Sequence, residues 1–256
     1  MPGLRKAFPT FQSFAEANLT DIYTTERLQI AQIFNATELR SGVLFNDGEG
    51  LFHFAPLPHM AQISASFGSS IVEVNGDGHP DIYLVQNAYS PQPETGRIDG
   101  GLSQLLLGKG DGDFRLVPAH ESGLTVAGDG KSLGVVDLNQ DGWVDFVAAC
   151  NGGPMHTFIN QGHHQNRGLS FRLLGLPGNP TGIGAKLTLT GSNVPRQTAE
   201  ISAGGSYLSQ SPGIAFFGIP SGAKPTNLAV QWPDGESTDV ALVGIKGNRV
   251  LVRHPK

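Results

Sequence analysis

Two similar acidic segments, each of nine residues, constrain the fold of this chain more than any other feature. The first runs from Glu73 to Asp81 and the second from Asp137 to Asp145. Both carry oxygen-bearing side chains at positions one, three, five and nine, and glycine at position six. The glycine lets the backbone bend sharply, so these oxygens and the carbonyl of position seven can converge on one Ca2+. We therefore predict two calcium sites, formed by Glu73, Asn75, Asp77, His79 and Asp81 in the first loop and by Asp137, Asn139, Asp141, Trp143 and Asp145 in the second.

Other interpretations of these loops differ in how well the residues support them. An EF-hand needs Glu at position twelve, where this chain has Leu84 and Ala148, so that class is excluded. Plain Asp/Asn/Gly turns between strands remain an alternative, and Glu73 is longer than the usual first ligand, which weakens the first site. His79 and Trp143 would supply only carbonyls, so their side chains are free to face solvent or a ligand. The flanking residues are β-prone, so we predict that each loop joins two strands: Ser70–Val74 to Asp81–Val85, and Leu133–Val136 to Asp145–Ala149.

The acidic loops belong to a longer repeat. Leu44–Phe52 matches Leu106–Phe114 at nearly the same offset that separates the two loops, and Phe158–Gly162 begins a third copy. Each period thus holds a strand pair around a Gly-rich turn and an acidic hairpin, about four strands in roughly 50 to 60 residues, which is typical of a propeller blade. The chain has room for about two to three blades, whereas a ring of seven would need roughly 400 residues. We therefore expect the C-terminal part of a larger protein.

The regions on either side of the repeats have different patterns. Phe11–Phe34 has helical spacing, with a capping box predicted over Ser13–Glu16 and an N-cap at Thr25. Beyond about Gly168 the pattern alternates, which predicts a small β-sandwich of roughly five to seven strands. Its expected strands are Lys186–Thr190, Thr198–Ile201, Ala215–Gly218, Asn227–Trp232 and Val250–Val252. The predicted fold class is all-β, with an N-terminal helical segment (1–41), propeller repeats (42–165) and a last domain (166–256).

The segment Gly204–Ser211 is a candidate ligand surface in the last domain. Tyr207 could offer a ring for stacking, and Ser209 and Gln210 could offer hydrogen bonds. The alternative is that Tyr207 packs against neighbouring strands, and the sequence favours this alternative.

Composition and motifs exclude several functional classes. The net charge of −5 without a basic stripe argues against nucleic-acid binding, and no apolar run is long enough for a membrane span. Residues 1–9 lack the apolar core of a signal peptide, so any export signal is expected to lie outside this chain. Gly130-Lys-Ser lacks the glycine that a phosphate loop needs at Thr125, and H-E-x-x-H and G-x-S-x-G are absent. His163 and His164 are expected in a solvated linker. We predict no catalytic residue.

The repeats resemble the FG-GAP/VCBS repeats of integrin-like β-propellers, which carry the same acidic hairpin and companion strand pair. The C-terminal third resembles the ASPIC/UnbV domain that closes the bacterial relatives of cartilage acidic protein. The residues that carry this second resemblance are Gly182–Leu189, Ala203–Ser211, Phe216–Ile219 and Leu228–Gly235. Together the resemblances imply a secreted or cell-surface protein with a calcium-bearing propeller, and they imply no catalytic residue.

Three functional hypotheses follow from these patterns. The leading one is a non-enzymatic, calcium-stabilised extracellular binding or adhesion module that contacts a glycan or an extracellular protein. The second is a structural piece that caps a propeller. The third is part of an enzyme that acts on extracellular glycans. The oligomeric state stays open.

Overall fold

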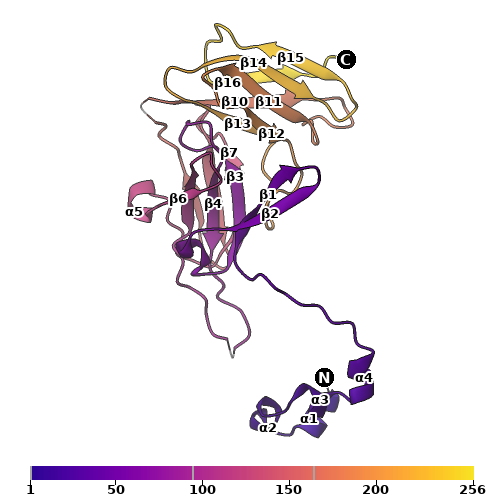
Figure 1. Ribbon diagram of the computed structural model, residues 1–256. Coiled ribbons are helices and arrows are strands. Elements are labelled where there is room, and N and C mark those ends of the chain that lie inside the picture. Colours follow the sequence, from indigo (N-terminus) through magenta and orange to yellow (C-terminus); the bar gives the residue numbers. More distant parts are fainter. Residues whose placement is uncertain (1, 94, 164) are drawn as a thin grey trace. The chain divides into compact units, whose positions relative to one another are not determined.

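The computed structural model describes residues 2–93, 95–163 and 165–256 (Figure 1). The all-β prediction is confirmed, because the described residues form several separate sheets and no closed barrel. The chain divides into two compact units, one up to Leu39 and one from Arg40 to Lys256. No helix in the described part of the chain is long and apolar enough to cross a membrane.

The first unit contains short helices, as its spacing predicted. The predicted caps are wrong by one to three residues. Thr10 begins the first capping box and accepts the N–H of Ser13, and Thr24, rather than Thr25, caps the last helix. That helix ends before the apolar residues Ile33 and Phe34, which are exposed. The helices are α1 (Pro2–Ala7), α2 (Phe11–Ala15), α3 (Leu19–Ile22) and α4 (Thr25–Gln29).

Two antiparallel sheets in the second unit correspond to the predicted blades. The first has four strands in chain order: β3 (Ser66–Val72), β4 (Asp81–Gln86), β5 (Gln104–Gly108) and β6 (Phe114–Val117). The second has three: β7 (Gly130–Val136), β8 (Asp145–Cys150) and β9 (Met155–Phe158). Each acidic loop joins the first two strands of its sheet, as predicted, because pairing ends at Val72 with Asp81 and at Val136 with Asp145. Short helices η1 (His59–Gln62) and α5 (Ala119–Ser122) lie in the connections.

A further strand pair precedes the blades. Strands β1 (Gly42–Gly48) and β2 (Leu51–Pro56) form a two-stranded sheet of their own. Leu44 pairs with Phe54 just as Leu106, at the same place in the next period, pairs with Leu116. The predicted repeat is therefore present in the register of the strands as well as in the sequence.

The C-terminal part is a two-layer β-sandwich, as predicted. One sheet has the order β13–β10–β16 and the other β12–β11–β14–β15. The strands β10 and β15 were not predicted, although β10 alternates the buried residues Leu169, Phe171 and Leu173. Their bounds are β10 (Arg167–Leu174), β11 (Lys186–Ser192), β12 (Gln197–Glu200), β13 (Ile214–Ile219), β14 (Lys224–Gln231), β15 (Ser237–Ala241) and β16 (Arg249–Arg253).

Separate hydrophobic clusters hold these layers together. One fills the sandwich, and another lies between the two blades, where the rings of Tyr83 and Phe146 are 5.0 Å apart. A third covers the opposite face of the first blade, around Ile82 and Leu106. Because side chains alternate along a strand, β4 contributes to both blade clusters and is buried throughout.

Candidate calcium loops

The first acidic loop is folded around its own carboxylates. Glu73 is 8% exposed, and its Oε1 accepts hydrogen bonds from the backbone N–H groups of Asn75 (3.0 Å) and Gly76 (2.6 Å). Asp77 Oδ1 accepts from the His79 N–H at 2.8 Å, and Asp77 Oδ2 accepts from Asn75 Nδ2 at 2.9 Å. Asp81 Oδ2 accepts from the Val74 N–H at 2.8 Å. All four acidic or amide side chains thus turn toward the loop.

Burial makes negative charge unfavourable in this loop. Burial and, next in size, the neighbouring Asp81 charge together raise the pKa of Glu73 to about 8, although the backbone hydrogen bonds lower it. Burial also raises the pKa of Asp81 to about 7, with Asp77 as a further negative neighbour. The carboxylates therefore lie close enough to oppose one another's ionisation. A bound cation would relieve this repulsion.

The second loop repeats these hydrogen bonds. Asn139 Nδ2 donates to Asp141 Oδ2 at 2.8 Å, and the Trp143 N–H donates to Asp141 Oδ1 at 2.9 Å. Asp145 accepts the N–H of Leu138 at 2.7 Å through Oδ2 and that of Asn160 at 2.8 Å through Oδ1. The two loops therefore share the hydrogen bonds of positions three, five and nine.

Asp137, at position one of the second loop, has an incomplete set of partners. Its Oδ2 accepts from the Gly142 N–H and the Ser170 hydroxyl, both at 3.2 Å, and lies 3.5 Å from Arg249 Nε. Its Oδ1 is buried and has no hydrogen-bond partner. An unsatisfied buried carboxylate oxygen costs free energy, and a hard cation is a ligand that would satisfy it.

The donor set fits Ca2+ in its chemistry. As the described side chains lie, no group of three or more His, Cys, Asp or Glu residues is arranged around one point. Asn75 and Asn139 add amide oxygens, and His79 and Trp143 add carbonyls, all of which are hard donors. The sequence-predicted residues of each loop are thus neighbours, but most of their side-chain oxygens accept hydrogen bonds instead of converging on one point.

The Trp143 side chain, which the sequence left free to face solvent or a ligand, is packed against other residues. Trp143 is only 8% exposed, and its ring lies against three glycines. A Cβ would come within 2.7 Å of this ring at Gly76 and within 2.8 Å at Gly162 and Gly168. Trp143 therefore packs the second loop against the first loop and against β10, because glycines at those places leave room for an indole. His79 is partly buried, with its ring over Gly110.

Residues of the sandwich contact both loops, and no sequence signal predicted them. Asn248 Nδ2 donates to the Asp141 carbonyl at 2.9 Å, and Arg249 Nη1 donates to Gln140 Oε1 at 2.5 Å. Asn166 Nδ2 donates to the Asn75 carbonyl at 3.0 Å. The loops thus lie at the contact between blades and sandwich, which depends on residues far away in the sequence.

The candidate ligand segment of the sandwich makes internal contacts. Ser209 Oγ donates to the Leu133 carbonyl at 2.9 Å, and Gln210 Nε2 donates to the Ser211 carbonyl at 2.9 Å. The Tyr207 ring lies 5.4 Å from that of Phe67 and is 46% exposed. Ligand contact by these three residues stays a prediction. His163 is exposed, and His164 lies outside the described residues.

A cleft of about 550 Å³ lies between strand β3 of the first blade and the sandwich. Strands β3 and β12 lie on either side of it, and each is an edge strand of its sheet. Its lining is mixed: polar residues such as Ser69, Glu73 and Thr198 alternate with apolar ones such as Val135 and Phe216.

Comparison with known proteins gives two family matches. Residues 175–255 match the family described as ASPIC and UnbV, and residues 74–148 match the family described as FG-GAP-like repeat. Both resemblances expected from the sequence are therefore confirmed. No curated protein matches the chain.

One solved structure aligns with a large part of this chain, but with a low TM-score. It is the crystal structure of Gamma-CGTASE from Alkalophilic bacillus clarkii, with 12% sequence identity and a TM-score of 0.15. The alignment covers 79% of this chain and 28% of that chain. At this TM-score the similarity carries no argument about fold or function.

Proposed function

We propose that this chain, which carries an FG-GAP-like repeat followed by an ASPIC/UnbV domain, is a calcium-binding, non-enzymatic module of a secreted or cell-surface protein. Its exposed loops would contact an extracellular glycan or protein. The observation that carries the proposal is the Asp137 Oδ1 atom, a buried carboxylate oxygen without a partner at position one of the D-x-N-x-D-G-x-x-D loop.

The residues that would hold the ions are those of the two loops. In the second loop they are Asp137, Asn139, Asp141, the Trp143 carbonyl and Asp145. The first loop supplies the equivalent set from Glu73 to Asp81. When bound, Ca2+ supplies positive charge that compensates several buried carboxylates at once.

The position of the loops explains what such a site would stabilise. Ser170 and Asn248 of the sandwich bond directly to the second loop, and the Trp143 ring packs between both loops and β10. A loop that is held more rigidly would therefore hold the sandwich more rigidly against the blades. Loops that bind a partner are commonly positioned by a rigid scaffold of this kind.

The capping hypothesis has one specific observation in its favour. The Ser206 and Ser211 hydroxyls accept the backbone N–H groups of Ser69 at 3.1 Å and Val135 at 3.0 Å. These N–H groups lie on β3 and β7, the first strands of the two blades. The sandwich thus satisfies edge groups of the blades whether or not a metal binds.

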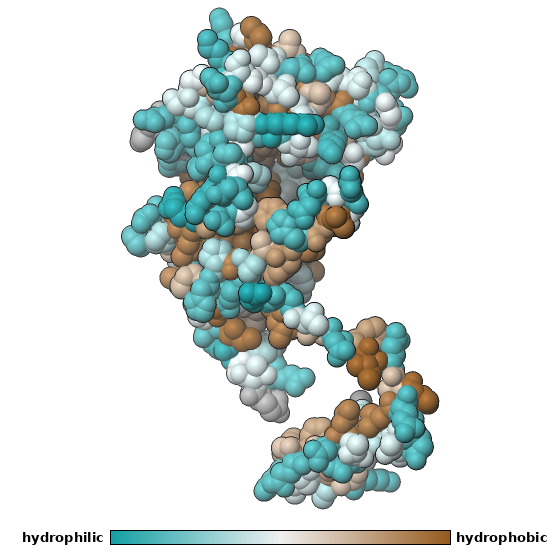
Figure 2. All heavy atoms as spheres, viewed as in Figure 1, coloured by the Kyte–Doolittle hydropathy of each residue, from teal (hydrophilic) through white to brown (hydrophobic). Residues whose placement is uncertain are grey.

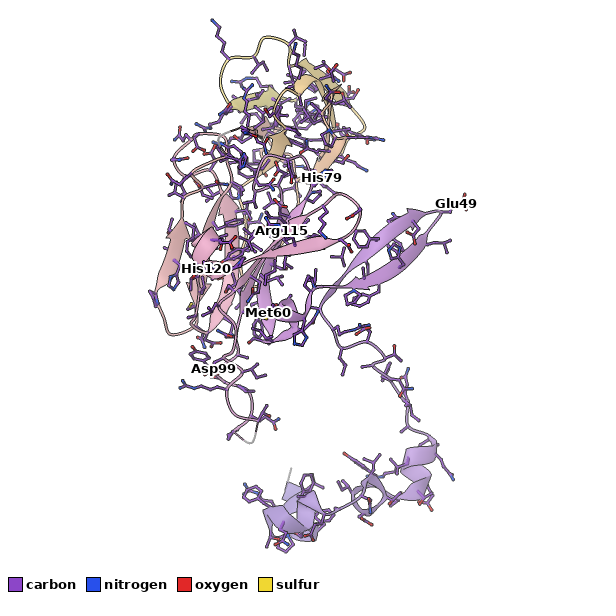
Figure 3. The ribbon with its side chains drawn as sticks, turned by 60° about the vertical axis from the view of Figure 1, so that its left-hand side comes forward. Glu49, Met60, His79, Asp99, Arg115 and His120 are labelled. Atoms are coloured by element: carbon purple, nitrogen blue, oxygen red, sulfur yellow. The ribbon has the colours of Figure 1, made fainter. Side chains whose placement is uncertain are left out.

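Calorimetric titration of Ca2+ into chelator-treated protein tests the proposal. We expect two sites, the loss of one in Asp141→Ala and of the other in Asp77→Ala, and a melting temperature that rises with Ca2+. Asp99→Ala is the matched control, since Asp99 is exposed in a different loop, well away from His79 of the first acidic loop (Figure 3). Absence of both binding heat and thermal shift would leave the loops as plain turns.

A further inference from the structure

The β1–β2 hairpin is a structural copy of the β5–β6 hairpin. Asn46 pairs with Phe52 as Gly108 pairs with Phe114, at the same offset that relates Leu44 to Leu106. Strand β9 is a third copy, in which Phe158 occupies the place of Leu106. The turn chemistry repeats as well. The Gly48 N–H donates to Asn46 Oδ1 at 2.9 Å, as the Gly162 N–H donates to Asn160 Oδ1 at 2.8 Å.

Strands β5 and β9 each have a neighbour that β1 lacks. Leu106 pairs with Ile82 on β4, and Phe158 pairs with Phe146 on β8. Each of these neighbours follows an acidic loop and begins with an Asp whose Oδ1 accepts one N–H from the end of the next strand or just beyond it. Asp81 accepts the Gly108 N–H at 2.9 Å, and Asp145 accepts the Asn160 N–H at 2.8 Å. Asn46 holds the equivalent position in β1, whose only neighbour in the described structure is β2.

The open side of β1 can be identified from its hydrogen bonds. The Leu57 N–H donates to the Ser41 carbonyl at 3.0 Å, so Ser41 and every second residue after it direct their backbone groups toward β2. The backbone groups of Leu44 and Asn46 therefore face the open edge. These are the residues whose equivalents bond to β4 and β8.

The exposure of the side chains on β1 also differs from that of their equivalents on β5, which have a neighbouring strand. Leu44 is 65% exposed, whereas Leu106 at the same place in the repeat is fully buried. Phe52 is 60% exposed as well. Val43, on the other face, packs on the cluster of the first blade, so the hairpin is anchored by one face only. Figure 3 shows the hairpin, with Glu49 at its turn, extending away from the four-stranded sheet, and Figure 2 shows hydrophobic atoms at the surface in this region.

We propose that the open edge of β1 is a docking site for an acidic-loop β-hairpin supplied by polypeptide other than residues 40–256. The second strand of that hairpin begins with Asp, whose carboxylate accepts the Asn46 N–H, and its next residue is apolar and pairs with Leu44. Unpaired strand edges and exposed apolar patches are the features that such strand addition uses. Residues 2–39 contain helices and no strand in the described structure, so they do not supply this partner. The proposal does not depend on calcium binding at the two loops.

The test uses the full chain with a second copy of Ser66–Asn87 fused to its N-terminus through a flexible Gly/Ser linker. This copy contains an acidic hairpin of the required kind, and the linker gives it a high effective concentration. We expect amide exchange at Leu44 and Asn46 to slow by about tenfold or more, because their N–H groups become hydrogen-bonded. The Leu106 amide is the internal reference, since a general gain in stability would slow it too.

Two variants make the test specific. Asp81→Ala in the fused copy removes the carboxylate for Asn46 without altering the chain itself, and should cancel much of the protection. Leu44→Asp should abolish it, and because Leu44 is exposed, this change should leave the melting temperature of the unfused chain unaltered. Unchanged exchange at Leu44 and Asn46 in the fusion, or protection that survives both variants, would overturn the proposal.

Discussion

Glu73→Gln is the substitution whose effect the structure defines most sharply. Glu73 is buried, and its Oε1 accepts the N–H groups of Asn75 and Gly76. A glutamine Oε1 can accept the same two hydrogen bonds, so the change removes the charge and leaves the loop geometry in place. Any effect on stability therefore reports the cost of ionising this side chain.

The sign and size of that effect follow from the pKa of Glu73. Burial, then the Asp81 charge, raises it from 4.5 to about 8, so the folded chain binds this proton more tightly than the unfolded chain. Its contribution to stability is complete below about pH 4.5 and is lost as the pH rises toward 8. At 1.36 kcal/mol per pKa unit, the full shift from 4.5 to about 8 corresponds to a loss of at most about 5 kcal/mol in the free energy of unfolding. Asp81 titrates in the same range. We therefore expect ionisation of Glu73 to lower the free energy of unfolding by about 2–4 kcal/mol at pH 7.5.

Urea unfolding in chelator at pH 5 and pH 7.5 measures this difference. Wild type should lose stability between the two pH values, while Glu73→Gln should lose less and be the more stable protein at pH 7.5. Glu200→Gln is the control, since Glu200 is exposed and should not change the pH dependence. Under the proposed function, Ca2+ should restore wild type at pH 7.5. Equal pH dependence of wild type and Glu73→Gln would refute the reasoning.

Three further changes test the contacts around the loops. Arg249→Gln removes a cation that lies 3.5 Å from Asp137. In calorimetry it should raise the calcium affinity of the second loop by about threefold to tenfold. An unchanged affinity would mean that Arg249 does not compete with calcium. Trp143→Ala should destabilise the chain by about 3–5 kcal/mol in urea unfolding, and a loss near that of an exposed residue would show that the indole is not a packing link. Gly218→Ala should cost at least about 2 kcal/mol, because a Cβ there would overlap Glu73 Oε2, and a neutral result would mean that the glutamate can move away freely.

The sequence by itself determined the local structure of the blades and loops. Glycine at position six has φ of 86° at Gly78 and 91° at Gly142, a conformation that other residues rarely adopt, so the loop shape was readable from the residue type. The β-prone apolar residues on either side of each acidic loop determined where the two strands that it joins lie. These properties depend on neighbours a few residues apart, which is the range over which a pattern is informative.

Only the tertiary structure decided which of these local features are covered. Leu44 and Leu106 occupy the same place in the repeat, yet one is exposed and the other is buried, because only the second has a neighbouring strand beyond its edge. Arg249 reaches Asp137 from the last strand of the sandwich, and the Trp143 indole turns into glycine-lined space instead of solvent. Backbone preference sets the loops and the strand register. Burial and charge pairing depend on contacts between residues far apart in the chain, which periodicity does not encode.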